Sequence, residues 1–252
     1  MDALAYDLTG PPDAPVLVLG GSLGTTRAMW QPQLDALTAR FRVLRYDHLG
    51  HGESPVPPGP YRIEELGGHV LRLLDQLDLA RVSYGGLSLG GMVGMWLAAH
   101  HPERVDRLAL LCTSAYLPPA EGWLLRARTV REQGTASVAD QVLARWFTPG
   151  FAERQPKVVQ RLAATFGGLP AEGYAGCCEA VAALDLRPVL PDIGAPTLVI
   201  AGADDPATPP AHGQAIADAV PGARIEVISG AAHLASVERP DLVNDLLLEH
   251  LA

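Results

Sequence analysis

Three kinds of sequence feature are scarce or missing in this chain of 252 residues: paired cysteines, membrane-length apolar runs and basic clusters. Its three cysteines, Cys112 and the pair Cys177-Cys178, have neither zinc-ligand spacing nor the even number of a disulfide framework. No apolar run approaches the roughly 20 residues of a membrane span. The N-terminal residues lack the basic start and apolar core of a secretory signal. We therefore expect three buried thiols and a cytoplasmic protein.

Acidic residues outnumber basic ones by 28 to 19, which gives a formal net charge of −9 at pH 7. Because no Lys/Arg-rich run interrupts this balance, neither nucleic acid nor an anionic membrane is an expected partner. An anionic small molecule is still compatible with the charge, since local arginines can override the global sign. We expect a small-molecule substrate, and the sequence leaves the oligomeric state open.

Short apolar runs alternate with helical patterns along most of the chain, which is typical of a parallel βαβ series. Residues 121–183 show only helical spacing, which indicates a helical insertion. The predicted fold is α/β, with core parts at 1–116 and 191–252 and a helical lid at 117–190 that covers the site. Strands are predicted near 15–19, 41–46, 82–87, 107–112, 196–201 and 224–228.

The stretch Gly86-Leu87-Ser88-Leu89-Gly90 lies between an apolar run and a helical pattern. A turn this tight between a strand and a helix leaves no room for side chains two residues to either side of the serine, and glycine at 86 and 90 removes the clash. The alternative is a flexible glycine-rich turn in which the serine has no catalytic role. The strand before the motif and the helix after it favour Ser88 as a nucleophile.

A serine hydroxyl is a weak nucleophile unless a base, and a group that orients the base, lie beside it. The predicted strand near 196–201 is followed by Asp204-Asp205, and composition alone does not separate these two aspartates. His233 follows the last predicted strand in a small-residue loop, whereas His212 and His250 lie in predicted helices. We expect Ser88, His233 and one of the two aspartates to form a catalytic triad.

Two backbone amides are expected to stabilise the oxyanion of such a reaction. One is Leu89 N–H, next to the nucleophile, and the other is Leu23 N–H in the glycine-rich loop 20–25. The alternative for this loop is a phosphate cradle, but it has neither the lysine of a Walker motif nor an acidic ribose partner.

Arg145-Trp146 pairs a cation with an aromatic ring beside a Thr-Pro-Gly break in the helical insertion. This pair is predicted to bind substrate. The other arginines and aromatic residues of the insertion, Arg126 among them, are expected to be ordinary helix surface or packing.

Several stretches spread along the chain carry a family resemblance. They include Ser22-Leu23-Gly24-Thr25, Gly50-His51-Gly52, Gly86-Leu87-Ser88, Arg145-Trp146-Phe147-Thr148-Pro149-Gly150-Phe151, Glu172-Gly173-Tyr174-Ala175-Gly176-Cys177-Cys178 and Asp205-Pro206-Ala207-Thr208-Pro209-Pro210. On these stretches the whole chain resembles an α/β-hydrolase of the 3-oxoadipate enol-lactonase family, in agreement with the helical lid that the residue pattern places after the sixth strand. The resemblance implies no cofactor and Asp205 as the triad acid. The implied activity is opening of 3-oxoadipate enol-lactone to 3-oxoadipate in bacterial degradation of aromatic acids, the β-ketoadipate pathway.

In the mechanism that this resemblance implies, Ser88 attacks the lactone carbonyl and His233 takes its proton. Arg145 is the expected partner of the substrate carboxylate through a charge-assisted hydrogen bond. The chain departs from the family pattern at His48-Leu49, Gly20-Gly21 and Leu89, which bears on substrate identity and not on the triad.

Four alternatives are a general carboxylesterase, another lactonase, a C–C bond hydrolase and a non-hydrolytic ligand receptor on the same fold. No metal is expected, because the pairs His48/His51 and His100-His101 lack the carboxylate and the spacing of a zinc site.

Overall fold

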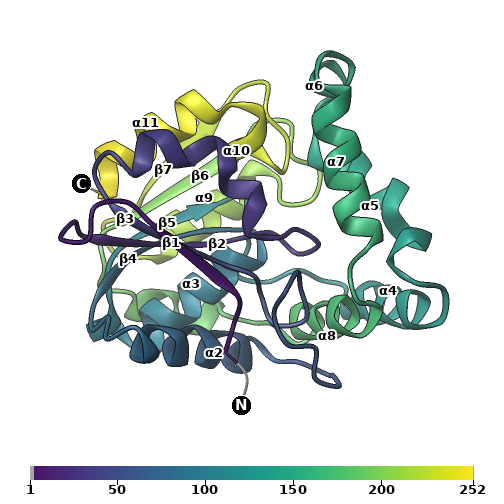
Figure 1. Cartoon of the computed structure of the whole chain (residues 1–252), viewed down its shortest axis with the longest axis horizontal. Helices are drawn as coiled ribbons and strands as arrows, with labels where there is room; N and C mark the ends of the chain where they lie inside the picture. Colours follow the sequence, from purple (N-terminus) through teal and green to yellow (C-terminus); the bar gives the residue numbers. More distant parts are fainter. Residues whose placement is uncertain (1–2, 252) are drawn as a thin grey trace.

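The computed structural model describes residues 3–251, which are built on one seven-stranded sheet (Figure 1). The strand order is β1-β3-β2-β4-β5-β6-β7, and every neighbouring pair is parallel except β1 with β3. The central strands are continuous apolar runs because helices cover both faces of the sheet. The bounds are β1 (Tyr6–Thr9), β2 (Val16–Gly20), β3 (Arg42–Tyr46), β4 (Val82–Leu87), β5 (Val105–Leu111), β6 (Thr197–Gly202) and β7 (Arg224–Ile228).

Helices pack on the two faces of this sheet, with α2 and α3 below it and α11 above it in Figure 1. Helix α3 is apolar all round because it lies between the sheet and α2. The core helices are α1 (Leu34–Leu37), α2 (Ile63–Gln76), α3 (Leu89–His100), α9 (Pro210–Ala219), α10 (Ala235–Glu238) and α11 (Pro240–Leu251), with 3-10 helices η1 (Arg27–Gln33) and η2 (Pro102–Arg104).

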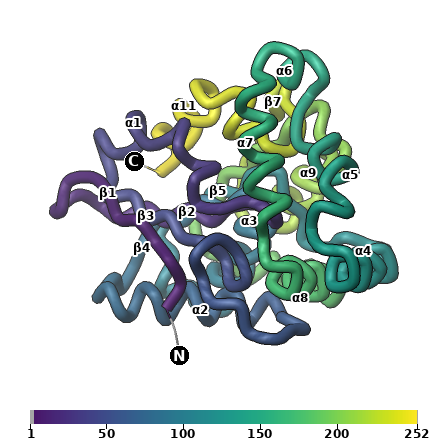
Figure 2. Tube along the Cα trace, turned by 45° about the vertical axis from the view of Figure 1, so that its right-hand side comes forward, coloured from purple at the N-terminus to yellow at the C-terminus, as the bar shows by residue number. Residues whose placement is uncertain are grey.

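A group of helices connects β5 to β6, and both views show it beside the sheet (Figures 1 and 2). We call residues 120–182 the helical segment. It consists of α4 (Ala120–Gln133), η3 (Thr135–Val138), α5 (Ala139–Trp146), α6 (Pro149–Arg154), α7 (Pro156–Gly167) and α8 (Ala171–Ala182), and η4 (Arg187–Asp192) leads from it to β6.

The predicted α/β fold is confirmed, with two corrections to the strands. The helical segment follows β5, the fifth strand in the described range, so its predicted place after a sixth strand is wrong. The reason is that residues 3–15, the described stretch before β2, hold one short strand only. That strand, β1, was missed because it is a partly exposed edge strand without an apolar run, paired along its length with β3.

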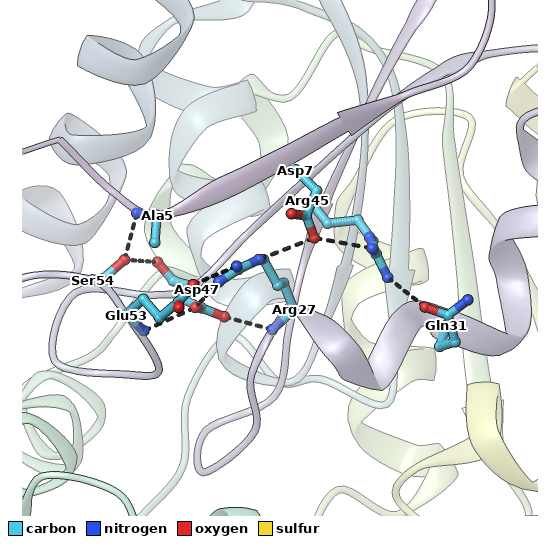
Figure 3. Close-up of polar contacts among 8 residues, drawn as sticks. All are labelled: Ala5, Asp7, Arg27, Gln31, Arg45, Asp47, Glu53 and Ser54. Carbon is cyan, nitrogen blue, oxygen red and sulfur yellow. Dashed lines mark hydrogen bonds and ion pairs between the residues drawn. The ribbon is translucent and has the colours of Figure 1, made fainter.

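A network of five charged side chains ties the amino-terminal part of the sheet together (Figure 3). The Arg27 guanidinium contacts Asp7, Asp47 and Glu53, and Arg45 donates a second hydrogen bond to Asp7 at 3.0 Å. The Asp47 carboxylate also accepts the backbone N–H of Arg27 at 2.6 Å and that of Glu53 at 3.1 Å. The network therefore links the loop after β2 to the loop after β3.

Two of the three acidic partners of Arg27 differ strongly in exposure, which allows a matched test of this network. The Asp47 side chain is 1% exposed, while that of Glu53 is 75% exposed. We expect Asp47→Asn to lower the free energy of unfolding by about 2 to 3 kcal/mol, because it leaves buried donors poorly paired. Glu53→Gln is expected to lower it by less than about 1 kcal/mol, since an exposed ion pair contributes little. Urea denaturation at pH 7 measures both, and equal effects would contradict this account.

Candidate active site

Ser88 lies in the turn between β4 and α3 with φ 55° and ψ −111°, a backbone conformation that is strained for a residue with a side chain. Hydrogen bonds hold it there. Ser88 N–H donates to the Leu111 carbonyl at 2.9 Å, and the Ser88 carbonyl accepts the Thr113 hydroxyl at 2.7 Å. The turn is thus fastened to the end of the neighbouring strand β5.

The glycines on either side of Ser88 are required by close backbone contacts. A Cβ atom on Gly86 would lie 2.3 Å from the carbonyl carbon of Gly90. A Cβ atom on Gly90 would lie 2.2 Å from the Gly20 carbonyl oxygen. These close contacts are the steric reason predicted for the two glycines. The contacts of Gly90 are with the end of β2 and the loop that follows it.

His233 and Asp205 form a buried pair, with 2.8 Å between His233 Nδ1 and Asp205 Oδ2. The neighbouring Asp204 is exposed. The two adjacent aspartates that the sequence left open thus have different surroundings, and the structure brings Asp205 to the histidine.

The Asp205 carboxylate accepts three hydrogen bonds besides that of His233. They come from Ala207 N–H at 2.7 Å, Thr208 N–H at 3.0 Å and the Thr208 hydroxyl at 2.7 Å. Burial opposes ionisation, but His233 and these donors outweigh it and hold the pKa of Asp205 below its usual value. The carboxylate therefore orients His233 with a hydrogen on Nδ1, which leaves Nε2 as a proton acceptor.

Thr208 is a site residue that the sequence analysis missed. Its signal is local, because an aspartate often accepts hydrogen bonds from groups two and three residues further along the chain. The stretch Asp205-Pro206-Ala207-Thr208 has the donor at that spacing.

One cavity, with about 490 Å³ of space that is partly open to solvent, brings most of the predicted site residues together. Ser88, His233, Leu23, Arg145 and Trp146 all line it. Arg145 lies at an exposed position, and Trp146 is buried. The residues that line the cavity without having been predicted are Ser22, Leu117, Trp123, Arg126, Val142, Tyr174, Ala207 and Thr208.

The two amides expected to hold an oxyanion are Leu23 N–H, from the loop after β2, and Leu89 N–H, at the first residue of α3. Within residues 3–251, neither N–H donates to another protein group. Leu23 lines the cavity, whereas Leu89 is buried at the start of α3.

The expectation that Arg126 is ordinary helix surface is wrong, because its side chain lines the cavity. Its guanidinium lies 4.7 Å from the centre of the Trp123 ring, and both residues line the cavity. A cation over an aromatic face is a favourable contact. The signal in the sequence is the spacing of three residues between Trp123 and Arg126, which places them on one face of a helix.

Glu238, also missed, ties the loop that carries His233 to the helical segment. Its buried carboxylate accepts Ala232 N–H at 2.7 Å and Thr148 N–H at 3.0 Å. Next to it, Leu234 N–H donates to the Trp146 carbonyl at 2.9 Å. The position of the histidine loop therefore depends on helices α5 and α6.

The described part of the chain brings no three His, Cys, Asp or Glu side chains close enough to share a metal ion. Cys112, Cys177 and Cys178 are buried free thiols, as predicted. None of the helices in residues 3–251 has the length and apolar character needed to cross a membrane.

The mostly parallel sheet, the strained serine between β4 and α3, and His233, which lines the same cavity and is bonded to Asp205, are typical of an α/β hydrolase. A family model described as the alpha/beta hydrolase fold matches residues 14–240, and the chain belongs to this family.

Two curated relatives and one solved structure illustrate the similarity. The chain is 44% identical to 3-oxoadipate enol-lactonase 2 of Acinetobacter baylyi, over 96% of this chain and 90% of that protein. It is 35% identical to 3-oxoadipate enol-lactonase 1 of the same organism, over 94% and 89%. The crystal structure of the enol-lactonase from Burkholderia xenovorans LB400 has a TM-score of 0.96 at 45% identity and covers 98% of this chain and 96% of that one. The protein is thus a hydrolase that acts on carboxylic esters or lactones.

The steric role of the turn glycines can be tested by adding one methyl group. We expect Gly86→Ala to lower the free energy of unfolding by about 3 kcal/mol, because its Cβ meets rigid backbone. The control is Gly85→Ala, whose Cβ would lie 3.0 Å from the movable end of Leu19. We expect it to change stability by less than about 1 kcal/mol. Thermal or urea unfolding of the two variants measures this difference, and equal losses would refute the steric explanation.

Proposed function

We propose that this protein opens 3-oxoadipate enol-lactone to 3-oxoadipate, with Ser88, His233 and Asp205 as its catalytic triad. The observation that carries the proposal is the cavity that Ser88 and His233 share with an arginine-bearing wall. The enol-lactonases of Acinetobacter baylyi and Burkholderia xenovorans, which the chain resembles along nearly its whole length, support the choice of substrate.

In the proposed reaction, His233 Nε2 accepts the Ser88 hydroxyl proton while Oγ attacks the lactone carbonyl carbon. Leu23 N–H and Leu89 N–H donate to the oxyanion that forms. The ring C–O bond then breaks and His233 protonates the enolate, which becomes the ketone. The leaving group stays attached to the acyl group, so product departs only after water, activated by His233, hydrolyses the acyl-enzyme.

The substrate carries a carboxylate besides its lactone ring, and this group needs a cation in the cavity. Arg145 is the proposed partner, beside the Trp146 ring, through a charge-assisted hydrogen bond. Because Arg145 lies at an exposed position, water screens part of its charge. We therefore propose that it contributes modestly to affinity and discriminates anionic from neutral substrates.

The helical segment takes the role of a lid in this proposal, with residues 117–190 as lid and 1–116 and 191–252 as the two parts of the core. Support comes from Trp123, Arg126, Arg145 and Trp146, which reach the cavity from α4 and α5. The place in aromatic-acid degradation and the cytoplasmic location stay predictions from the sequence.

Removing the proposed nucleophile tests the reaction directly. We expect wild-type kcat/KM for 3-oxoadipate enol-lactone in the range of roughly 10⁴ to 10⁸ M⁻¹s⁻¹. Ser88→Ala should lower kcat for this lactone and for p-nitrophenyl acetate by about 10⁴-fold or more. The control is Ser83→Ala, which removes another buried serine hydroxyl, from strand β4 before the turn. Ser88-dependent ester hydrolysis without lactone turnover would refute the substrate, and unchanged activity would refute the triad.

Arg145→Met tests recognition of the substrate carboxylate. We expect KM for the anionic lactone to rise by about 5- to 30-fold, the equivalent of about 1 to 2 kcal/mol of lost binding. KM for neutral p-nitrophenyl acetate should change by less than about twofold, since that ester has no carboxylate. Arg128→Met is the control, because Arg128 is exposed on α4 and is not among the residues lining the cavity. Equal losses on both substrates would exclude Arg145 from carboxylate binding.

A further inference from the structure

Two buried histidines after β3 hold the loop that carries Leu23, and the proposed reaction does not use them. His48 Nε2 lies 2.8 Å from the Gly21 carbonyl oxygen, and Gly24 N–H donates to His51 Nε2 at 3.0 Å. Both imidazoles are buried, His51 completely. Gly21, two residues before Leu23, and Gly24, directly after it, are therefore each bonded to a different histidine.

The chemistry of these contacts sets the tautomer of each ring. A carbonyl oxygen can only accept, so His48 Nε2 carries a hydrogen. A backbone N–H can only donate, so His51 Nε2 has none and the His51 hydrogen is on Nδ1. That Nδ1 lies 3.4 Å from the Leu49 carbonyl oxygen and 4.0 Å from Cys177 Sγ. The two rings thus hold the loop in opposite neutral tautomers.

Their surroundings keep both rings neutral. Burial lowers the pKa of His48 to about 4, against the opposing effects of the Gly21 carbonyl and Asp47. Burial, with a smaller contribution from His48, lowers the pKa of His51 to about 3. A protonated His51 would turn a donor toward Gly24 N–H, itself a donor, and the contact would be lost.

Hydrogen bonds hold this loop, because its glycines supply no side-chain contacts. Besides the two histidine contacts, Thr25 N–H and the Thr25 hydroxyl donate to the Ser22 carbonyl at 3.1 and 2.8 Å. Gly24 has φ +89°, in the region that glycine adopts freely, and Gly20 and Gly21 also lack side chains. The Gly21 carbonyl accepts a second hydrogen bond, from Gly90 N–H at 2.9 Å, at the start of the helix that carries Leu89. The two predicted oxyanion donors therefore belong to one hydrogen-bonded frame.

We propose that His51 and His48 are positioning residues for the oxyanion loop. His51 fixes the Leu23–Gly24 peptide and His48 fixes Gly21, so that Leu23 N–H stays directed at the reacting carbonyl oxygen. This inference rests on the proposed function, because it takes the oxyanion role of Leu23 from it. Neither histidine contacts the substrate, and each acts through the backbone that it holds.

The test measures kcat and KM for p-nitrophenyl acetate in wild type, His51→Leu and His51→Gln. Leucine keeps much of the volume and removes the acceptor, whereas the glutamine Oε1 can accept Gly24 N–H in place of Nε2. We expect His51→Leu to lower kcat by about 10- to 100-fold with KM changed by less than about threefold, since a misplaced oxyanion donor affects the transition state. His51→Gln should recover kcat to within about fivefold of wild type.

His250→Leu is the matched control. His250 is also a buried histidine bonded to backbone, at 3.0 Å from the Leu108 carbonyl oxygen, and it does not line the cavity. We expect it to lower the unfolding temperature and to leave kcat within about twofold of wild type. We expect kcat to be lower in His48→Leu than in His48→Gln, as for the two His51 variants, because the glutamine amide can donate to the Gly21 carbonyl.

Long-range ¹H–¹⁵N spectra of the wild-type protein at pH 7 test the anchor without any substitution. We expect His51 as the neutral Nδ1–H tautomer and His48 as the neutral Nε2–H tautomer. A cationic ring, the reversed tautomers, wild-type kcat in His51→Leu, or equal losses in His51→Leu and His51→Gln would each overturn the inference. Wild-type protein without Ser88-dependent turnover would instead overturn the proposed function, and the catalytic part of this inference with it.

Discussion

The backbone conformation at Ser88 is the constraint on which the rest of the site depends. A positive φ at a residue with a side chain persists only where the surroundings hold it. Here strand β5 holds it from one side, through the Ser88 N–H bond to the Leu111 carbonyl. The loop after β2 approaches from the other side so closely that Gly90 can carry no side chain. The nucleophile candidate and the oxyanion loop are therefore parts of one packing arrangement.

Buried titratable groups around this turn differ in charge because their partners differ. Asp205 stays ionised despite burial, since four donors including His233 face its carboxylate. His48 and His51 stay neutral, because burial lowers their pKa values and neither has a carboxylate bonded to it. Asp47 lies beside them with its own charge matched by Arg27. Each group thus has a defined role as a donor or an acceptor before any substrate arrives.

The helical segment, as well as the sheet, forms the cavity and holds its residues in place. Helices α4 and α5 supply arginines and tryptophans to the cavity wall. The same segment is bonded to the histidine loop through Glu238 and the Trp146 carbonyl. A change in the helices would therefore alter both the substrate pocket and the position of His233.

The sequence by itself determined the features that follow from local rules: the α/β alternation, the glycines around Ser88, and His233 after the last strand. These rest on periodicity and on sterics within a few residues. Local rules left Asp204 and Asp205 open and the family resemblance favoured Asp205, but only the tertiary structure gave the physical reason, because two adjacent carboxylates differ in what faces them and not in type. It alone placed Arg126 on the cavity wall and paired His51 with Gly24, 27 residues away in the chain. Such contacts form only when the sheet brings distant loops to one edge, and no local pattern records them.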